Sequence, residues 1–120
     1  GSLLRAACPC GFETEVLLVG SGYRNHTMTL KAPAYCAGCK TIVVSEYQTK
    51  NKRCGTCREH LTFYNDPALQ SHHNHDPKTP PVFRWRTDDS ATEFVLSDIL
   101  YLCPACRKKT MKFTDAGCWD

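Results

Sequence analysis

Short stretches of alternating apolar and polar residues run along this chain, and a period of two predicts strands rather than helices. In the first half, the pattern and the β-branched residues predict strands over 12–19, 26–32 and 41–47. Gly20-Ser21-Gly22 lies between the first two ranges and predicts a turn. The first 49 residues therefore have the pattern of a hairpin followed by a third strand.

The second half continues the same pattern with a longer interior. Strands are predicted over 60–64, 82–86, 93–96 and 110–113. Asp66 is a good N-cap and Pro67 suits the first helical position, which predicts one short helical turn ending near Gln70. The range 72–81 is polar and rich in proline and histidine, so it is predicted to be a loop. We expect a small, mainly β protein with at most one short helix.

Cysteine spacing changes this picture most, because eight of the nine cysteines lie in four close pairs. The pairs are Cys8/Cys10, Cys36/Cys39, Cys54/Cys57 and Cys103/Cys106. Disulfide frameworks scatter their cysteines, whereas zinc sites bring them in short-spaced pairs. Four pairs supply the ligands for two tetrahedral four-thiolate sites. The spacing predicts two structural Zn²⁺ ions and a reducing compartment, the cytoplasm or a nucleus.

The predicted hairpin between the first two pairs favours sequential pairing of the ligands. In that arrangement Cys8, Cys10, Cys36 and Cys39 bind one metal. Cys54, Cys57, Cys103 and Cys106 bind the other. The rival is a cross-brace, as in RING-type domains, in which the first and third pairs share a metal and the second and fourth share another. The absence of histidine from every ligand pair counts against it.

These pairs, with the strands between them, resemble the zinc-ribbon, or rubredoxin-like, superfamily. The resemblance implies two consecutive ribbon units, 3–49 and 50–120, the second with the loop 72–81 inserted. Each unit is expected to have its own small apolar core, and a domain of that size usually needs a metal to fold. Cys8-Pro9-Cys10 departs from the usual pattern, because only one residue separates its cysteines. The resemblance is specific for fold and metal, and it says little about function.

The net charge of +3 counts the cysteines as neutral thiols, so it does not apply to a chain that binds metal. Eight thiolates and two Zn²⁺ ions together contribute minus four, so the formal charge of the metallated chain is −1. Local clusters of cations remain beside the third and fourth pairs, and sequential pairing predicts that they gather at one end. They are Lys50, Lys52, Arg53, Arg58, Arg107, Lys108, Lys109 and Lys112. They either compensate the negative metal centre or form a patch for an anion or a nucleic acid.

Four-cysteine sites leave no open coordination position, so no enzymatic activity and no small-molecule substrate are predicted. The expected function is a module that binds a macromolecule, either nucleic acid or protein, with no membrane partner. The alternatives are a RING-like adaptor and a rubredoxin-like iron or redox protein. His72, His73 and His75 form a candidate third metal site, with a plain polar loop as the simpler interpretation. The ninth cysteine, Cys118, is interpreted as a small packed residue rather than a nucleophile.

Overall fold

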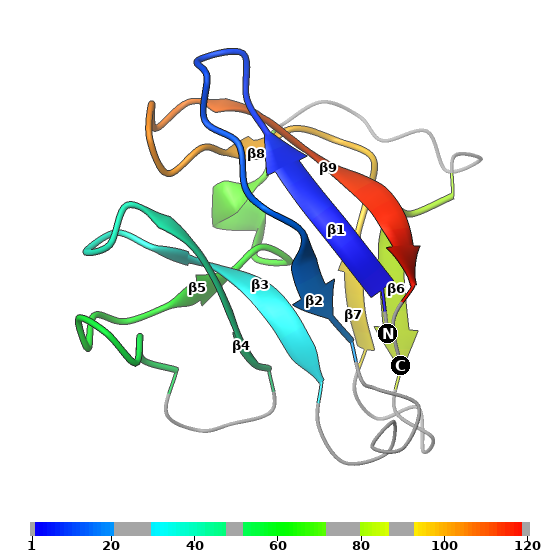
Figure 1. The fold of residues 1–120 in the computed structure, drawn as a ribbon, viewed down its shortest axis with the longest axis horizontal. Coiled ribbons are helices and arrows are strands. Elements are labelled where there is room, and N and C mark those ends of the chain that lie inside the picture. The colour runs from blue at the N-terminus through cyan, green and yellow to red at the C-terminus, as the bar shows by residue number, and fades with distance from the viewer. Residues whose placement is uncertain (1, 21–29, 48–51, 72–79, 87–92, 119–120) are drawn as a thin grey trace.

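A computed structural model describes residues 2–20, 30–47, 52–71, 80–86 and 93–118 of the chain. It confirms a small, mainly β protein built from antiparallel sheets (Figure 1). The elements are β1 (Ser2–Ala7), β2 (Leu17–Val19), β3 (Lys31–Cys36), β4 (Thr41–Glu46), β5 (Thr62–Phe63), η1 (Pro67–Leu69), β6 (Phe83–Arg86), β7 (Glu93–Leu96), β8 (Tyr101–Leu102) and β9 (Lys109–Cys118). The predicted helical turn is the 3₁₀ helix η1, capped by the Asp66 carboxylate, which accepts from the Ala68 amide. In the described part of the chain, no helix is long and apolar enough to cross a membrane.

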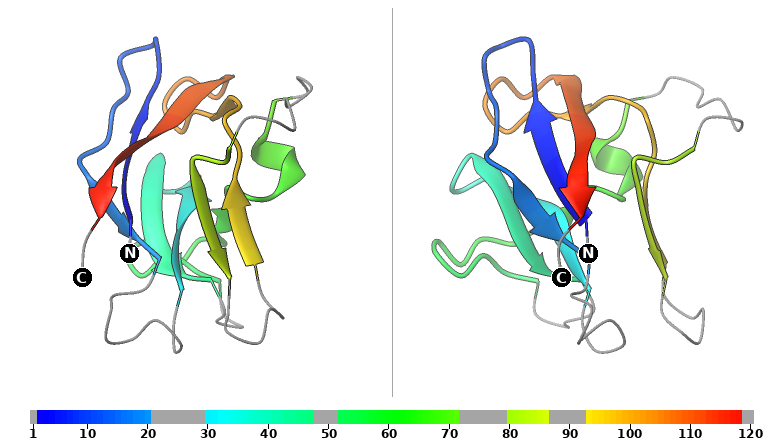
Figure 2. Two further views of the ribbon diagram at one scale, coloured as in Figure 1. Left: turned by 90° about the vertical axis from the view of Figure 1, so that its right-hand side faces the viewer. Right: turned by 45° about the vertical axis from the view of Figure 1, so that its right-hand side comes forward.

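Three sheets make up the fold. One has the strand order β2-β1-β9-β8, the second β4-β3-β5, and the third is the β6–β7 hairpin. In the left view of Figure 2, β1 and β9 stand on one side and the β6–β7 hairpin on the other, with β3 and β4 between them. The two larger sheets are joined where Gly20 and Lys31 exchange backbone hydrogen bonds of 2.6 and 3.0 Å.

The pairing of β1 with β9 brings the two ends of the described chain together. The register runs from Ser2 opposite Cys118 to Ala7 opposite Lys112. Leu4 and Ala6 of β1 are buried, and Arg5 and Ala7 are exposed, so the strand does follow a period of two. The sequence pattern does not predict β1, because its inward residues include an alanine, which has weak β propensity.

The predicted strands agree with the structure to different degrees. The range 41–47 contains β4, and 93–96 coincides with β7. The range 12–19 shortens to β2, and most of 26–32 lies outside the described residues. Pro33 lies inside β3. It is tolerated there because it needs no N–H toward β4, and its carbonyl accepts from the Tyr64 amide at 3.2 Å.

The division into units 3–49 and 50–120 does not match the way the strands combine. β1 pairs with β9, and β3 pairs with β5, so strands from both predicted units share each of the larger sheets. The two expected cores are also one cluster of buried side chains. Tyr47, from the first half, makes edge contacts with Phe63 and Phe94 at centroid distances of 5.1 and 5.0 Å.

A second aromatic group ties β5 to the sheet that contains β8 and β9. Tyr64 is fully buried, and its ring meets Tyr101 and Phe113 at centroid distances of 6.0 and 5.2 Å. Its hydroxyl donates to the Leu102 carbonyl at 2.9 Å, so the one polar atom of the ring is satisfied in the core. This bond lies next to Cys103 and helps to place the fourth cysteine pair.

Candidate metal centres

Eight cysteines converge into two groups of four. The first group is Cys8, Cys10, Cys103 and Cys106, and the second is Cys36, Cys39, Cys54 and Cys57. Within each group all four sulfur atoms lie within 4.8 Å of one another. An ideal tetrahedron with Zn–S bonds near ~2.3 Å has sulfur–sulfur edges of about 3.8 Å. Each group could therefore hold a metal ion with little rearrangement.

The predicted sequential pairing is wrong, and so is the cross-brace. The first cysteine pair joins the fourth, and the second joins the third, so one group is nested inside the other along the chain. The physical reason is the β1–β9 ladder, which places Ala7 opposite Lys112 and so brings Cys8 close to Cys106. The predicted strand 12–19 was expected to form a hairpin with the range 26–32. β2, which lies within 12–19, pairs with β1.

All four cysteine pairs lie on the same kind of turn. The residue after the second cysteine has a positive φ in every case: Gly11 (104°), Lys40 (53°), Arg58 (61°) and Arg107 (59°). In the third turn, Arg58 N donates to Cys54 O and Cys54 N donates to Glu59 O, and the fourth turn repeats this pattern. We call each of these turns a knuckle.

The first knuckle keeps this pattern although it is one residue shorter. Gly11 N donates to Cys8 O at 3.0 Å, and Cys8 N donates to Phe12 O at 2.8 Å. Glycine suits its φ of 104°, a region that side chains disfavour. The Cys-Pro-Cys spacing therefore gives a shortened knuckle that still directs both sulfurs into one group.

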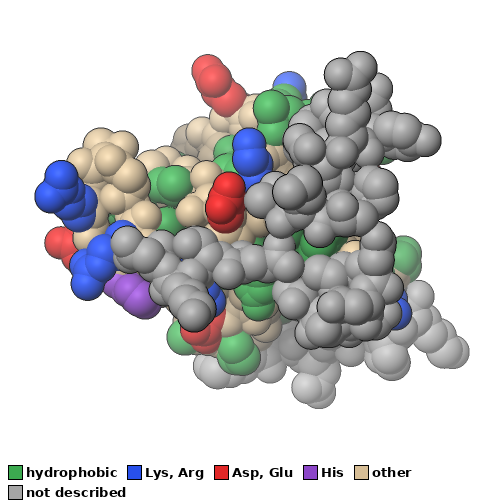
Figure 3. Space-filling model, turned by 90° about the horizontal axis from the view of Figure 1, so that it is seen from below, with side chains coloured by type: hydrophobic (Ala, Val, Ile, Leu, Met, Phe, Trp, Pro, Cys, Tyr) green, Lys and Arg blue, Asp and Glu red, His purple; other side chains and the backbone are tan. Residues whose placement is uncertain are grey.

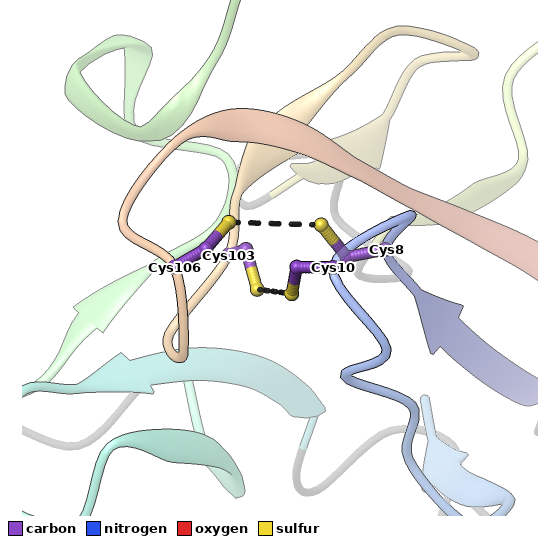
Figure 4. Close-up of side chains that lie close together, drawn as sticks. All are labelled: Cys8, Cys10, Cys103 and Cys106. Carbon is purple, nitrogen blue, oxygen red and sulfur yellow. Dashed lines mark hydrogen bonds between the residues drawn. The ribbon is translucent and has the colours of Figure 1, made fainter.

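The first group lies between the turn that follows β1 and the turn between β8 and β9 (Figure 4). Cys8 Sγ is 3.7 Å from Cys106 Sγ, and Cys10 Sγ is 3.7 Å from Cys103 Sγ. The Thr110 hydroxyl lies 3.1 Å from Cys8 Sγ and 3.8 Å from Cys106 Sγ. It can donate to a thiolate and spread its charge, and no sequence motif predicts this role for Thr110.

The second group lies between the β3–β4 turn and the knuckle that precedes β5. Cys36 Sγ is 3.3 Å from Cys57 Sγ, and Cys39 Sγ is 3.7 Å from Cys54 Sγ. Backbone amides of the turns point at two of the sulfurs. Cys39 N donates to Cys36 Sγ and Thr56 N donates to Cys54 Sγ, both at 3.4 Å.

The thiols of each group differ in pKa because their surroundings differ. The backbone amides of Cys57 and Thr56 lower the pKa of Cys54 to about 6, and the amide of Lys108 lowers that of Cys106 to about 6. The neighbouring sulfurs of Cys57 and Cys54 raise the pKa of Cys39 to about 12, and burial raises that of Cys103 to about 12. Each group thus has at least one thiol whose pKa is lowered, while a cation is needed to ionise all four together.

The predicted cationic residues do not gather around one metal, because the third and fourth pairs belong to different groups. Lys52, Arg53 and Arg58 flank the second group, and Lys40, which was not predicted, follows Cys39 in the same group. The remaining four surround the fourth knuckle, in the first group: Arg107, Lys108, Lys109 and Lys112.

Other predicted site residues are either outside the described chain or exposed. Lys50 and the candidate third site at His72, His73 and His75 fall outside the described residues. Cys118 lies at the end of β9, opposite Ser2, and is exposed rather than packed. It takes no part in either cysteine group.

Fold and site together define a small β protein with two four-cysteine groups that could hold metal ions. Comparison of the chain with protein-family models, with curated proteins and with solved structures finds no match.

Nested pairing makes a prediction that separates it from both rivals. In the cadmium-substituted protein, observed by ¹¹³Cd NMR, Cys8→Ser and Cys103→Ser should perturb the same one of two signals. Cys36→Ser and Cys54→Ser should perturb the other, because a serine oxygen replaces a thiolate in that group only. Sequential pairing would instead link Cys8 with Cys36, and a cross-brace would link Cys8 with Cys54.

Gly38 offers a steric test of the second group. A Cβ at this position would lie 2.8 Å from Cys57 Sγ and 2.7 Å from Glu59 Cγ, so Gly38→Ala should displace a ligand sulfur. Overpacking of about 1–3 kcal/mol corresponds to a loss of metal affinity of roughly 5- to 150-fold in this group. Competition with a chromophoric chelator measures it.

The matched control for this test is Gly55→Ala, in the opposing knuckle of the same group, where no atom lies within 4 Å of the added Cβ. Its affinity should stay within about twofold, since nothing has to move. Equal losses in the two variants would contradict the steric role of Gly38.

Proposed function

We propose that both cysteine groups bind Zn²⁺ and that the two ions are structural. The observation that carries this proposal is the closed geometry of each group, with four sulfurs within 4.8 Å. Four thiolates saturate a tetrahedral ion, so no position is left for water or a substrate. Structural zinc contributes about 10–16 kcal/mol in zinc-finger peptides, much of it coupled to folding. The protein is then a non-catalytic scaffold whose small sheets are held by metal.

The purified protein should contain two zinc ions per chain and be colourless. Removal of the metal with a strong chelator should unfold it, because each cysteine group joins strands of one of the two larger sheets. Elemental analysis and circular dichroism check these outcomes. A red protein that contains iron would contradict zinc, and an unchanged melting curve after complete metal removal would contradict a structural role.

We further propose that this scaffold binds a macromolecule with an anionic surface, and that the partner is a nucleic acid. Within the described residues, ion pairs to carboxylates involve only Arg84, Arg86 and Lys112 among the lysines and arginines. The other described cations of the four knuckles have no carboxylate partner among the described residues: Lys40, Lys52, Arg53, Arg58, Arg107, Lys108 and Lys109. Unpaired cations at the surface are available to phosphates.

Both pairs of knuckles project on the same side of the molecule. In Figure 1 they lie at the left, with the knuckles after β1 and β8 above those between β3 and β4 and before β5; the second view of Figure 2 agrees. A single extended strand could therefore pass both. A Zn²⁺ ion with four thiolates has a formal charge of minus two, and four cations lie beside each cysteine group. The cations therefore exceed what the metal centre needs, and the excess can contact phosphates.

Arg58 and Arg107 allow a clean test, because both have positive φ and glycine adopts this conformation without strain. The double variant Arg58→Gly/Arg107→Gly should keep its fold and bind single-stranded RNA more weakly. Loss of two phosphate contacts should reduce the slope of log affinity against log salt by about 1.4. Fluorescence anisotropy at several salt concentrations measures it.

The control is Arg84→Gln, which removes a cation that is already paired with Glu93 at 3.4 Å. It should leave the salt dependence unchanged. If the wild-type protein binds no RNA or DNA but retains a protein partner in pull-down experiments, the nucleic-acid proposal fails.

A further inference from the structure

A groove of about 430 Å³ opens beside the knuckle of Cys54 and Cys57, between β4 and η1. Its walls include Tyr47, Lys52, His60, Phe63, Asn65 and Asp66. Its volume falls in the range of roughly 300–1,000 Å³ that is usual for ligand sites. His60 joins the groove to the knuckle, since it forms an isolated backbone bridge with Arg53.

Hydrogen-bond donors predominate among the polar groups of this groove. Lys52 Nζ lies over the rings of Tyr47 and Phe63, 5.4 and 5.5 Å from their centroids. No described carboxylate pairs with it. The ammonium is therefore held in place by two aromatic rings, while its N–H groups have no anionic acceptor in the described part of the chain.

Tyr47 and Asn65 add two more donors. Asn65 Nδ2 donates to the Tyr47 hydroxyl oxygen at 2.7 Å, so the phenol acts as an acceptor in this bond. Its own hydrogen is left to donate to something else, and the Asn65 amide keeps a second N–H. Asp66, the carboxylate of the groove, already accepts from the Ala68 amide at 2.9 Å as the cap of η1.

We propose that this groove binds one phosphate group of a single-stranded nucleic acid, through Lys52, Tyr47 and Asn65. A phosphate supplies oxygen acceptors for several donors at once, and its charge meets the unpaired ammonium. The proposal rests on the proposed function and makes it more specific, because it assigns one contact point to one groove.

The surroundings of the groove favour a polymer over free phosphate. Arg53 lies at its edge, with Nη1 donating to the Arg58 carbonyl at 3.1 Å, so two further cations continue along the knuckle. In Figure 3, Lys or Arg side chains lie next to a histidine side chain on the surface. A chain of phosphates can use these cations in succession, whereas a single ion cannot.

The test compares Lys52→Gln with Lys31→Gln. Lys31 is an exposed lysine that does not line the groove and has no ion pair in the described residues, so its variant controls for the loss of one charge. Lys52→Gln should weaken binding of a single-stranded RNA oligonucleotide about tenfold and lower the salt slope by about 0.7. Lys31→Gln should change affinity by less than about twofold.

A second variant guards against misfolding, since Lys52 packs on core aromatic rings. Tyr47→Phe keeps the ring and removes only the hydroxyl, and it should weaken RNA binding roughly fivefold, as expected for one lost hydrogen bond. Near-ultraviolet circular dichroism confirms the fold of both variants. In ¹H–¹⁵N NMR spectra of the wild type, RNA should shift the side-chain amide signals of Asn65.

The outcomes separate this inference from the proposed function. If RNA binds but Lys52→Gln and Tyr47→Phe behave like Lys31→Gln, the groove assignment is overturned while nucleic-acid binding stands. If inorganic phosphate shifts the Asn65 signals and RNA does not bind, a free anion is the ligand and the inference fails. Binding of an acidic peptide in place of RNA overturns both.

Discussion

The antiparallel pairing of β1 with β9 is the constraint on which the rest of this structure depends. It joins the two ends of the described chain, and by doing so it commits the first and last cysteine pairs to each other. The inner two pairs are then left to form the second group. The buried alternation of Leu4 and Ala6 against Met111 and Phe113 stabilises the ladder. Two short runs of apolar side chains thus decide how eight thiolates are shared between two centres.

Local features of this protein could be predicted from its sequence, and long-range ones could not. The ligand residues followed from spacing alone, and β4, β7 and η1 followed from alternation and capping. The choice of partner for each cysteine pair depends on contacts between residues about 100 positions apart, such as Cys8 and Cys106. A short-spaced pair of cysteines carries no information about that choice, since all four knuckles share the positive φ after the second cysteine.

Two residues that support the cysteine groups, Thr110 and Lys40, were not predicted from the sequence. Thr110 contacts Cys8 only because β9 runs beside β1, so no local pattern could identify it. Lys40 is different, because it follows a cysteine pair in the same way as Arg58 and Arg107 do. Alignment of the four pairs by their second cysteine shows a lysine or arginine after three of them and a glycine after the fourth.

The nested arrangement has a consequence for how the molecule is assembled. The inner group joins cysteines that are 15 and 21 residues apart, and the outer group joins cysteines that are 93 and 98 apart. Because the entropy lost on closing a loop grows with the logarithm of its length, the outer closure costs about 1.5 kcal/mol more. During synthesis the inner centre can form while the chain is still growing, whereas the outer one must wait for its last ligands. If both groups bind metal as proposed, the species expected to accumulate when metal is scarce is a half-loaded chain with its inner site filled.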